Sequence, residues 1–223
     1  MKLIIDRGNT LYKVAVFDKD KLVEVRTYHD LTVSVLTTAF LSFDIKKSIF
    51  CSVGGRENTE ILNFLKENSE FVFMTEQLAL PVRIAYKTPS SLGKDRIASV
   101  VGASQIVEGK PVLVIDAGSC ICFDYIDKNA VYHGGSIAPG FEMKYKALHN
   151  FTADLPLLNL KSEDVGLCGQ STDMCMHSGV INGTLCEIRG FIDSYSEIDK
   201  DLTVMLSGGN ADFIAERLNR NVI

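Results

Sequence analysis

Short apolar runs separated by polar turns set the pattern at the start of the chain. Leu3–Ile5 is one such run, and it ends on Asp6. A turn containing Gly8 and Asn9 follows, and Val14–Phe17 forms the second run. Two apolar runs joined by a Gly/Asn turn predict a β-hairpin.

The same pattern returns in the second half of the chain. The run Val112–Ile115 ends on Asp116, the turn holds Gly118 and Ser119, and Ile121–Phe123 resumes the apolar pattern. The aspartates of the two hairpins are 110 positions apart in a chain of 223 residues. This spacing indicates an internal duplication, although two ordinary tight hairpins would give the same local pattern.

We therefore predict a two-lobed α/β protein with one lobe at residues 1–108 and the other at residues 109–223. Each lobe would present one hairpin to a central cleft. Apolar positions at helical spacing predict helices at residues 31–40, 57–68, 97–106, 141–148, 173–195 and 213–218. Further strands are predicted at residues 22–28, 48–53, 71–73 and 202–206, with a strand-turn-strand at 125–132 and a shaped glycine loop at 134–140. Strands that alternate with helices favour an α/β sheet over a sandwich.

The first turn carries residue types that suit a triphosphate. Gly8 allows the backbone to approach a phosphate, and successive N–H groups in such a turn can bind an anion. Thr10 adds a hydroxyl donor and Lys13 adds a cation. Asp6 can hold a hydrated Mg²⁺.

Two other places have side chains that could take part in chemistry. Asp95 and Arg96 stand in or just before the first turn of a predicted helix, where an acid would also suit the helix dipole without any chemistry. The strand ending at Leu206 runs into Gly208–Gly209 and then a helix. That arrangement suits a flat ligand such as a nucleobase, or it is a plain strand-to-helix turn.

Composition excludes several classes of protein. The net charge is −5, with 46% apolar and 23% charged residues, so a nucleic-acid or acidic-membrane surface is not expected. No signal peptide and no membrane span are expected either. The six cysteines form no Cys-x-x-Cys pair, and we interpret them as reduced, buried thiols of a cytoplasmic protein. The four histidines show no spacing that suits a metal.

Four blocks together resemble the type III pantothenate kinases of the sugar kinase, Hsc70 and actin superfamily. The blocks occur in the order Asp-Arg-Gly-Asn-Thr (residues 6–10), Thr-Pro-Ser-Ser-Leu-Gly-Lys-Asp-Arg (88–96), Asp-Ala-Gly-Ser (116–119) and Gly-Gly-Ser-Ile-Ala-Pro-Gly (134–140). The match covers almost the whole chain, and the Leu-Gly-x-Asp-Arg block separates this family from its relatives.

The resemblance implies a duplicated ribonuclease-H-like (actin-like ATPase) fold, a homodimer, and ATP-dependent phosphorylation of pantothenate, the first step of coenzyme A synthesis. It also implies Mg²⁺ and a monovalent cation such as K⁺ or NH₄⁺. By position, Asp95 would be the general base and Asp116 would bind the monovalent cation. The residues implied for ATP are Asp6, Arg7, Gly8, Asn9, Thr10, Leu11, Tyr12, Lys13 and Ser119. Those implied for pantothenate are Tyr86, Gly93, Lys94, Asp95, Arg96 and Thr172.

The sequence departs from the family pattern in two blocks. The second hairpin has Ser119-Cys120 where Thr-Ala is expected, and Ser136 stands where a third glycine is commoner. Ser119 keeps the hydroxyl donor. Two other classes stay open: an actin-like ATPase without a small-molecule acceptor, and a kinase for another small hydroxyl acceptor such as a sugar.

Overall fold

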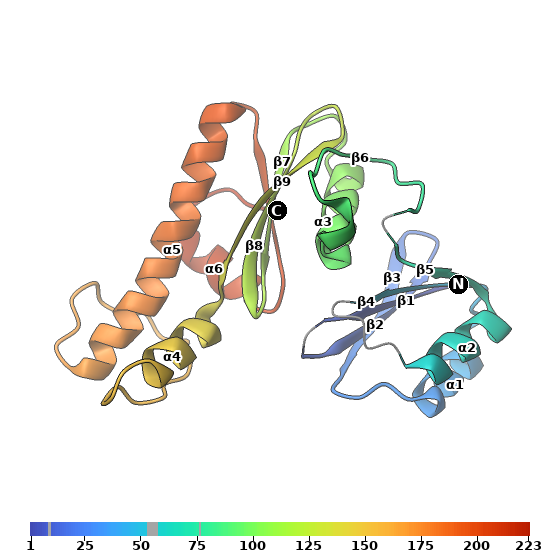
Figure 1. Cartoon of the computed structure of the whole chain (residues 1–223), viewed down its shortest axis with the longest axis horizontal. Coiled ribbons are helices and arrows are strands. Elements are labelled where there is room, and N and C mark those ends of the chain that lie inside the picture. The colour runs from blue at the N-terminus through green and yellow to red at the C-terminus, as the bar shows by residue number, and fades with distance from the viewer. Residues whose placement is uncertain (9, 53–57, 76) are drawn as a thin grey trace. The chain divides into compact units, whose positions relative to one another are not determined.

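The computed structural model describes residues 1–8, 10–52, 58–75 and 77–223 (Figure 1). It divides the chain into two compact units. Unit 1 comprises Met1–Ala79 and Thr88–Ala98, and unit 2 comprises Leu80–Lys87 and Ser99–Ile223. The lobe boundary near residue 108 stays a prediction.

Unit 1 is built on a five-stranded sheet of order β3-β2-β1-β4-β5. β1, β2 and β3 are antiparallel neighbours, whereas β4 runs parallel to both β1 and β5. The bounds are β1 Lys2–Arg7, β2 Tyr12–Asp18, β3 Lys21–Tyr28, α1 Val33–Ser42, β4 Lys47–Ser52, α2 Thr59–Asn68, β5 Glu70–Phe73 and the 3₁₀ turn η1 Pro89–Ser91. Helix α3, Lys94–Ile106, begins in unit 1 and ends in unit 2.

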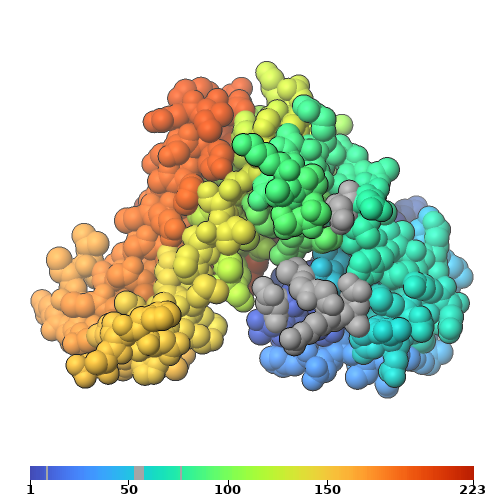
Figure 2. Space-filling model, in the orientation of Figure 1, coloured from blue at the N-terminus to red at the C-terminus, as the bar shows by residue number. Residues whose placement is uncertain are grey.

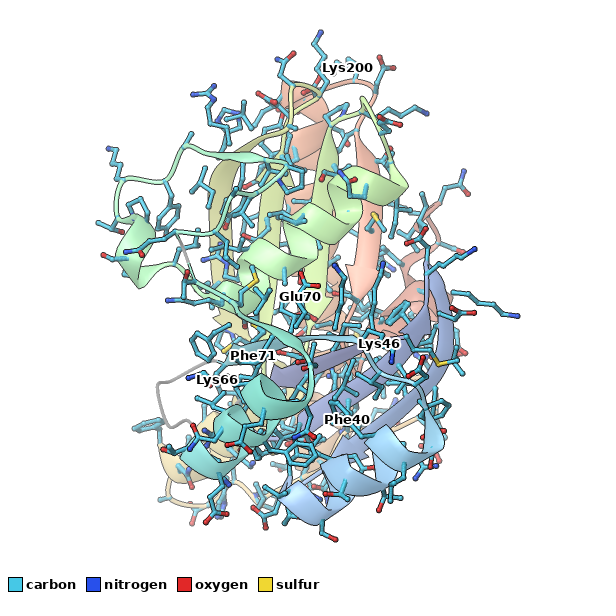
Figure 3. The ribbon with its side chains drawn as sticks, turned by 90° about the vertical axis from the view of Figure 1, so that its right-hand side faces the viewer. Phe40, Lys46, Lys66, Glu70, Phe71 and Lys200 are labelled. Atoms are coloured by element: carbon cyan, nitrogen blue, oxygen red, sulfur yellow. The ribbon has the colours of Figure 1, made fainter. Side chains whose placement is uncertain are left out.

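Helices α1 and α2 cover one face of this sheet (Figure 1). Each begins at a side chain that accepts a backbone N–H, Thr32 for α1 and Asn58 for α2. Figure 3 shows Phe40 between the two helices, where its ring meets the edge of Phe64 at 5.3 Å between centroids. The fully buried side chains that these helices and the sheet contribute to the core are Leu3, Ile5, Leu36, Phe50, Ile61 and Leu65. Each contributes about 1.5–3 kcal/mol by burial.

Unit 2 is built on a second five-stranded sheet of order β10-β7-β8-β9-β6. The bounds are β6 Arg83–Ile84, β7 Val112–Ala117, β8 Cys120–Ile126, β9 Val131–Pro139, α4 Phe141–Asn150, α5 Thr172–Ile198, β10 Thr203–Ser207 and α6 Ala211–Leu218. The core lies between this sheet and helices α4, α5 and α6, with Phe123 stacked on Phe191 at 4.1 Å between ring centroids.

The two sheets repeat one topology. In each, a central strand pairs antiparallel with the next strand in sequence and parallel with a later one: β1 with β2 and β4, and β7 with β8 and β10. The third strand continues the antiparallel meander in both sheets. This agreement supports the duplication that the two hairpins predicted.

Two predictions were wrong. The glycine-rich segment predicted as a loop at residues 134–140 is mostly strand, because β9 extends to Pro139 and pairs with β8 from Gly134 to Pro139. The cysteines also differ in burial. Cys51 is buried and Cys120 and Cys122 are half-buried, whereas Cys168, Cys175 and Cys186 are exposed. Within the described ranges, none of the six lies in a disulfide.

The helices of the described residues include none that combines the length and the apolar character needed to span a bilayer.

Candidate active site

The first hairpin places its polar side chains at the carboxyl end of β1. The amide of Gly8 donates to the carbonyl of Leu11 at 3.0 Å and closes the turn. Asp6 pairs across the hairpin with Lys13, so these two side chains share one face of the sheet. Asn9, also predicted in this turn, lies outside the described residues.

The neighbouring residues of the hairpin face the other way. Arg7 pairs with Tyr12, and its guanidinium lies 5.3 Å from the centre of the Tyr12 ring. Successive side chains of a strand point to opposite faces, so both lie on the face opposite Asp6. Any contact that these two residues make with a ligand on the Asp6 face would therefore use their backbone.

The start of α3 approaches Asp6 within unit 1. Cys51 on β4 pairs with Asp6 and is 7% exposed. The pKa of its thiol is raised to about 12, first by burial and then by the negative charges of Asp6 and Asp95, whereas Lys94 acts in the opposite direction. The charges of Asp6, Asp95 and Lys94 therefore all act on the Cys51 thiol within unit 1.

The backbone fixes Asp95 at this position. Its Oδ1 accepts a hydrogen bond from the amide of Arg96 at 2.9 Å. A Cβ on Gly93 would collide with the same carboxylate, so the glycine leaves room for it. Arg96 is buried at 8% exposed. The Leu-Gly-Lys-Asp-Arg block thus forms the entry to α3, and its Asp95 carboxylate is close enough to Cys51 of β4 to raise the pKa of that thiol.

The second hairpin builds a comparable site within unit 2. Asp116 is the penultimate residue of β7, and its Oδ1 accepts a hydrogen bond from the Ser207 hydroxyl at 3.1 Å. Ser207 ends β10 directly opposite Asp116 in the parallel register. Gly208 follows with φ +91°, and a Cβ there would collide with the backbone of Ala117 and the carboxylate of Asp116. A glycine is therefore required for this turn.

A third segment joins this site. The amide of Gly140 donates to the carbonyl of Ser119 at 3.0 Å, and the amide of Asn210 donates to the carbonyl of Ala117, also at 3.0 Å. The β7–β8 turn, the start of α4 and the start of α6 thus meet around the second hairpin. Ser119 itself is exposed, so its hydroxyl is open to a ligand.

Two residues predicted to bind pantothenate lie in unit 2, apart from each other. Tyr86 follows β6 and stacks on Tyr132 of β9 at 6.4 Å between ring centroids. Thr172 is the exposed first residue of α5, at the opposite end of that helix from Ile198. Figure 1 shows this start of α5 well separated from β6 in unit 2.

The oxygen atoms at both hairpins fit the cations implied by the resemblance. Carboxylate, hydroxyl and carbonyl oxygens are the ligands of hard cations. Asp116, Ser207 and the Ala117 carbonyl gather such oxygens in unit 2, and Asp6 offers a carboxylate in unit 1. Among the described residues, no group of three or more His, Cys, Asp or Glu side chains forms a dedicated metal cage.

Two cavities are lined by none of the described residues of either hairpin turn. One of about 280 Å³ lies between β2, β3 and α1 and is lined by Val14, Arg26 and Phe43 among others. The other, of about 610 Å³, lies beside the end of α5 and is lined by Tyr125, His133 and others. Neither is lined by a predicted site residue in the part of the chain that the structure describes.

Sequence reasoning missed two residues of these sites, Cys51 and Ser207. Each lies at or next to the end of the strand that runs parallel to the central strand of its sheet, and each lies opposite the hairpin aspartate. A polar or small residue at the carboxyl end of a parallel neighbour was the available signal. Using it requires the strand order, which the sequence alone did not supply.

Comparisons with solved structures first identify the fold. The fold is similar to that of a candidate 2-dehydro-3-deoxygalactonokinase from Sinorhizobium meliloti (TM-score 0.55, 12% identity, 100% of this chain and 92% of that one). It is also similar to a Campylobacter jejuni protein described as a candidate Baf family transcriptional activator (TM-score 0.56, 22% identity, 97% and 88%). With two α/β units of repeated topology, the chain has the two-lobed fold of the actin-like sugar kinases.

The family follows from the sequence. The sequence model of the type III pantothenate kinase family matches residues 2–194. A type III pantothenate kinase of Christiangramia forsetii is 39% identical over 230 residues, covering 100% of this chain and 91% of that one. The chain belongs to the type III pantothenate kinase family, and the predicted resemblance is confirmed.

Proposed function

We propose that this protein transfers the γ-phosphoryl group of ATP to the primary hydroxyl of pantothenate, giving 4'-phosphopantothenate in the first step of coenzyme A synthesis. The observation that carries the proposal is the Leu-Gly-Lys-Asp-Arg block, in which the Arg96 amide donates to the Asp95 carboxylate and Gly93 leaves room for it at the start of α3. Family membership supports the same reaction.

Phosphoryl transfer asks a protein for alignment and charge neutralisation more than for covalent chemistry. In unit 1, the Gly8 and Thr10 turn supplies donors for the ATP phosphates, and Lys13 offsets the charge that develops on them. In unit 2, the Ser119 hydroxyl supplies another donor.

Asp95 accepts the proton of the substrate hydroxyl as that oxygen attacks the phosphorus. A carboxylate is a weak base, so much of its contribution is orientation of the hydroxyl. Gly93, Lys94, Arg96 and Tyr86 hold pantothenate in reach.

Cations complete the site. Asp6 would hold Mg²⁺ through water, and Asp116 with Ser207 would hold a monovalent cation such as K⁺. When bound, these ions neutralise phosphate charge. The strand ends and the glycine turns around them hold the carboxylates of Asp6 and Asp116 in place.

We also propose a homodimer in the cytoplasm. Thr172 lies apart from Tyr86 within unit 2, so a role for Thr172 in pantothenate binding requires a second copy to present it. Exposed apolar side chains near α5 support an interface there. They are Met143, Phe151, Leu157 and Leu167, which are 42%, 87%, 53% and 79% exposed. The segment that carries most of them is gold in Figure 2.

The test is ATP consumption by the purified protein with and without pantothenate, in K⁺ and in Na⁺ buffer. We expect turnover that depends on pantothenate and is faster in K⁺. ATP hydrolysis at the same rate without pantothenate would instead identify an actin-like ATPase. Phosphorylation of a sugar in place of pantothenate would identify a kinase for another acceptor.

A further inference from the structure

The backbone next to Tyr86 is anchored by a very short strand. β6 has two residues and lies beside the start of β9, where Arg83 N donates to Ala130 O and Ala85 N donates to Tyr132 O, both at 2.9 Å. Ala85 and Lys87 on either side of Tyr86 are exposed, whereas Tyr86 is half-buried. These two backbone hydrogen bonds do not set the orientation of the Tyr86 ring, so its orientation depends on the side chains and backbone around it.

The first of these neighbours is the ring of Tyr132. The two rings are nearly parallel, at 4° between their planes and 6.4 Å between centroids. That geometry is an offset stack. Tyr132 is fully buried, so its ring is a fixed surface.

A buried hydrogen bond fixes Tyr132 in turn. Its hydroxyl donates to Oδ1 of Asp124 at 2.5 Å, and Asp124 is 1% exposed. A hydrogen bond to a carboxylate at such a depth is strong, and losing it leaves a buried polar group that is costly to desolvate. Asp124 therefore holds the Tyr132 ring in one orientation.

The second neighbour of the Tyr86 ring is a glycine. Gly134 has φ +96°, and a Cβ there would lie 3.0 Å from both Cδ2 and Cε2 of the Tyr86 ring. This spacing is tighter than ordinary van der Waals contact. The bare backbone of Gly134 thus leaves room for the ring that Tyr132 supports.

We propose that Tyr132, Asp124 and Gly134 form a seat that sets the Tyr86 ring for pantothenate. The seat is defined as these three residues of β8 and β9. They are positioning residues, because they act through Tyr86 and do not themselves touch the substrate. The proposal rests on the proposed function, since it assumes that pantothenate is the ligand that Tyr86 meets.

The test measures pantothenate affinity apart from chemistry. Tyr132→Phe keeps the stacking ring and removes the hydroxyl, whereas Gly134→Ala introduces the Cβ that would press on Tyr86. We expect each to raise the KM for pantothenate, and its Kd by calorimetry, about twofold to tenfold, the range that an aromatic pair supports. The KM for ATP and kcat should stay within about twofold.

Tyr125→Phe is the matched control. Tyr125 lies on β8 in the same sheet, and its hydroxyl also donates to a carboxylate, Asp199 Oδ2 at 2.6 Å. It stacks near His133 and Tyr195 and not on Tyr86. Loss of this equivalent bond should leave pantothenate binding unchanged.

A double-mutant cycle tests whether the seat acts through Tyr86. In a Tyr86→Leu background, Tyr132→Phe should have no further effect on the Kd for pantothenate. Full additivity would overturn the seat, and so would equal effects on ATP and pantothenate. If Tyr132→Phe folds poorly by thermal melting, Gly134→Ala decides the same question, and unchanged pantothenate affinity in that variant overturns the seat.

The two proposals fail in different ways. An unmodified protein that phosphorylates pantothenate, together with seat variants that bind it normally, would overturn the seat alone. An unmodified protein that neither binds nor phosphorylates pantothenate would overturn the proposed function, and the seat with it.

Discussion

At the scale of single residues, Asp95 occupies a position that has two physical interpretations. An acid in the first turn of a helix is stabilised by the helix dipole whether or not it does chemistry. Asp95 differs from an ordinary acid of this kind because Gly93 makes room for its carboxylate and because that carboxylate acts on Cys51 beside Asp6.

Replacing Asp95 with Asn separates the two interpretations. The amide keeps the size of the side chain but cannot accept the substrate proton, so turnover should fall about 10²-fold or more. ATP affinity measured by calorimetry should be unchanged. The control is Asp212→Asn, which removes an exposed acid from the first turn of α6. Near-normal turnover in Asp95→Asn would show that the dipole is its whole role.

Asp116 allows a second prediction at this scale. Asp116→Asn removes the charge that would hold a monovalent cation, and Ser207→Ala removes the hydroxyl that donates to Asp116 at 3.1 Å. Loss of one partner of a metal ligand typically weakens ion binding about 10-fold to 100-fold. The K⁺ concentration at half-maximal activity should therefore rise in both variants, more in Asp116→Asn. A K⁺ dependence like that of the unmodified protein would contradict this cation role.

At the scale of elements, hydrogen bonds between side chains hold α4 against α5. The Tyr145 hydroxyl lies 2.7 Å from Nδ1 of His177, and both residues are buried. Lys144 adds bonds to Thr184 at 2.9 Å and Glu187 at 2.6 Å. Since Gly140, the residue before α4, donates to the Ser119 carbonyl, these bonds also fix one side of the second hairpin.

Stability should depend on pH through His177. Its pKa is lowered, first by burial and then by the charge of Lys161, against smaller opposite effects of Asp173 and Glu163. The unfolded chain then binds a proton more readily than the folded chain. Stability should be full above the ordinary histidine pKa of about 6.5 and should fall as pH drops below it.

Denaturant unfolding at pH 7.5 and pH 5.0 measures this loss. Carboxylates also titrate in that range, so the comparison is with His177→Gln, which cannot gain the proton. The loss between the two pH values should be smaller in His177→Gln. An equal loss in both proteins would mean that His177 contributes nothing to the pH dependence.

The elements show how far the sequence could lead. Apolar runs predicted the hairpin strands and β10, and helical spacing predicted α5. The duplication was predicted from the turn pattern that occurs once in each half of the chain. β9 was missed because Gly134, Gly135 and Gly140 indicate a loop by composition. In the structure, a Cβ on Gly135 would collide with the backbone of Phe123, so this glycine serves close strand packing.

The candidate site was predictable only in part, because some of its residues come together only through the order of the strands. The hairpin aspartates and the block before α3 have local signatures. The partners Cys51 and Ser207 depend on which strand lies beside which, and that order is set by tertiary pairing. The seat beneath Tyr86 joins residues 86, 124, 132 and 134 through sheet register, which no local pattern reveals.

At the scale of the whole molecule, the predicted homodimer connects the exposed apolar side chains to substrate binding. Phe151 follows α4 and is 87% exposed, and Leu167 in the segment before α5 is 79% exposed. Exposed apolar patches mark contacts with other molecules, and we propose that Phe151 and Leu167 belong to one. Phe151→Glu should therefore give a monomer by size-exclusion chromatography with light scattering.

Leu41→Glu is the control, because Leu41 is 84% exposed at the end of α1 in unit 1 and lies in a different part of the chain. It should leave the oligomeric state unchanged. If a second copy presents Thr172, monomeric Phe151→Glu should also bind pantothenate more weakly, in the same direction as Thr172→Val in the dimer. A monomer that binds pantothenate as well as the dimer would separate Thr172 from the substrate, and a dimer that survives Phe151→Glu would place the interface elsewhere.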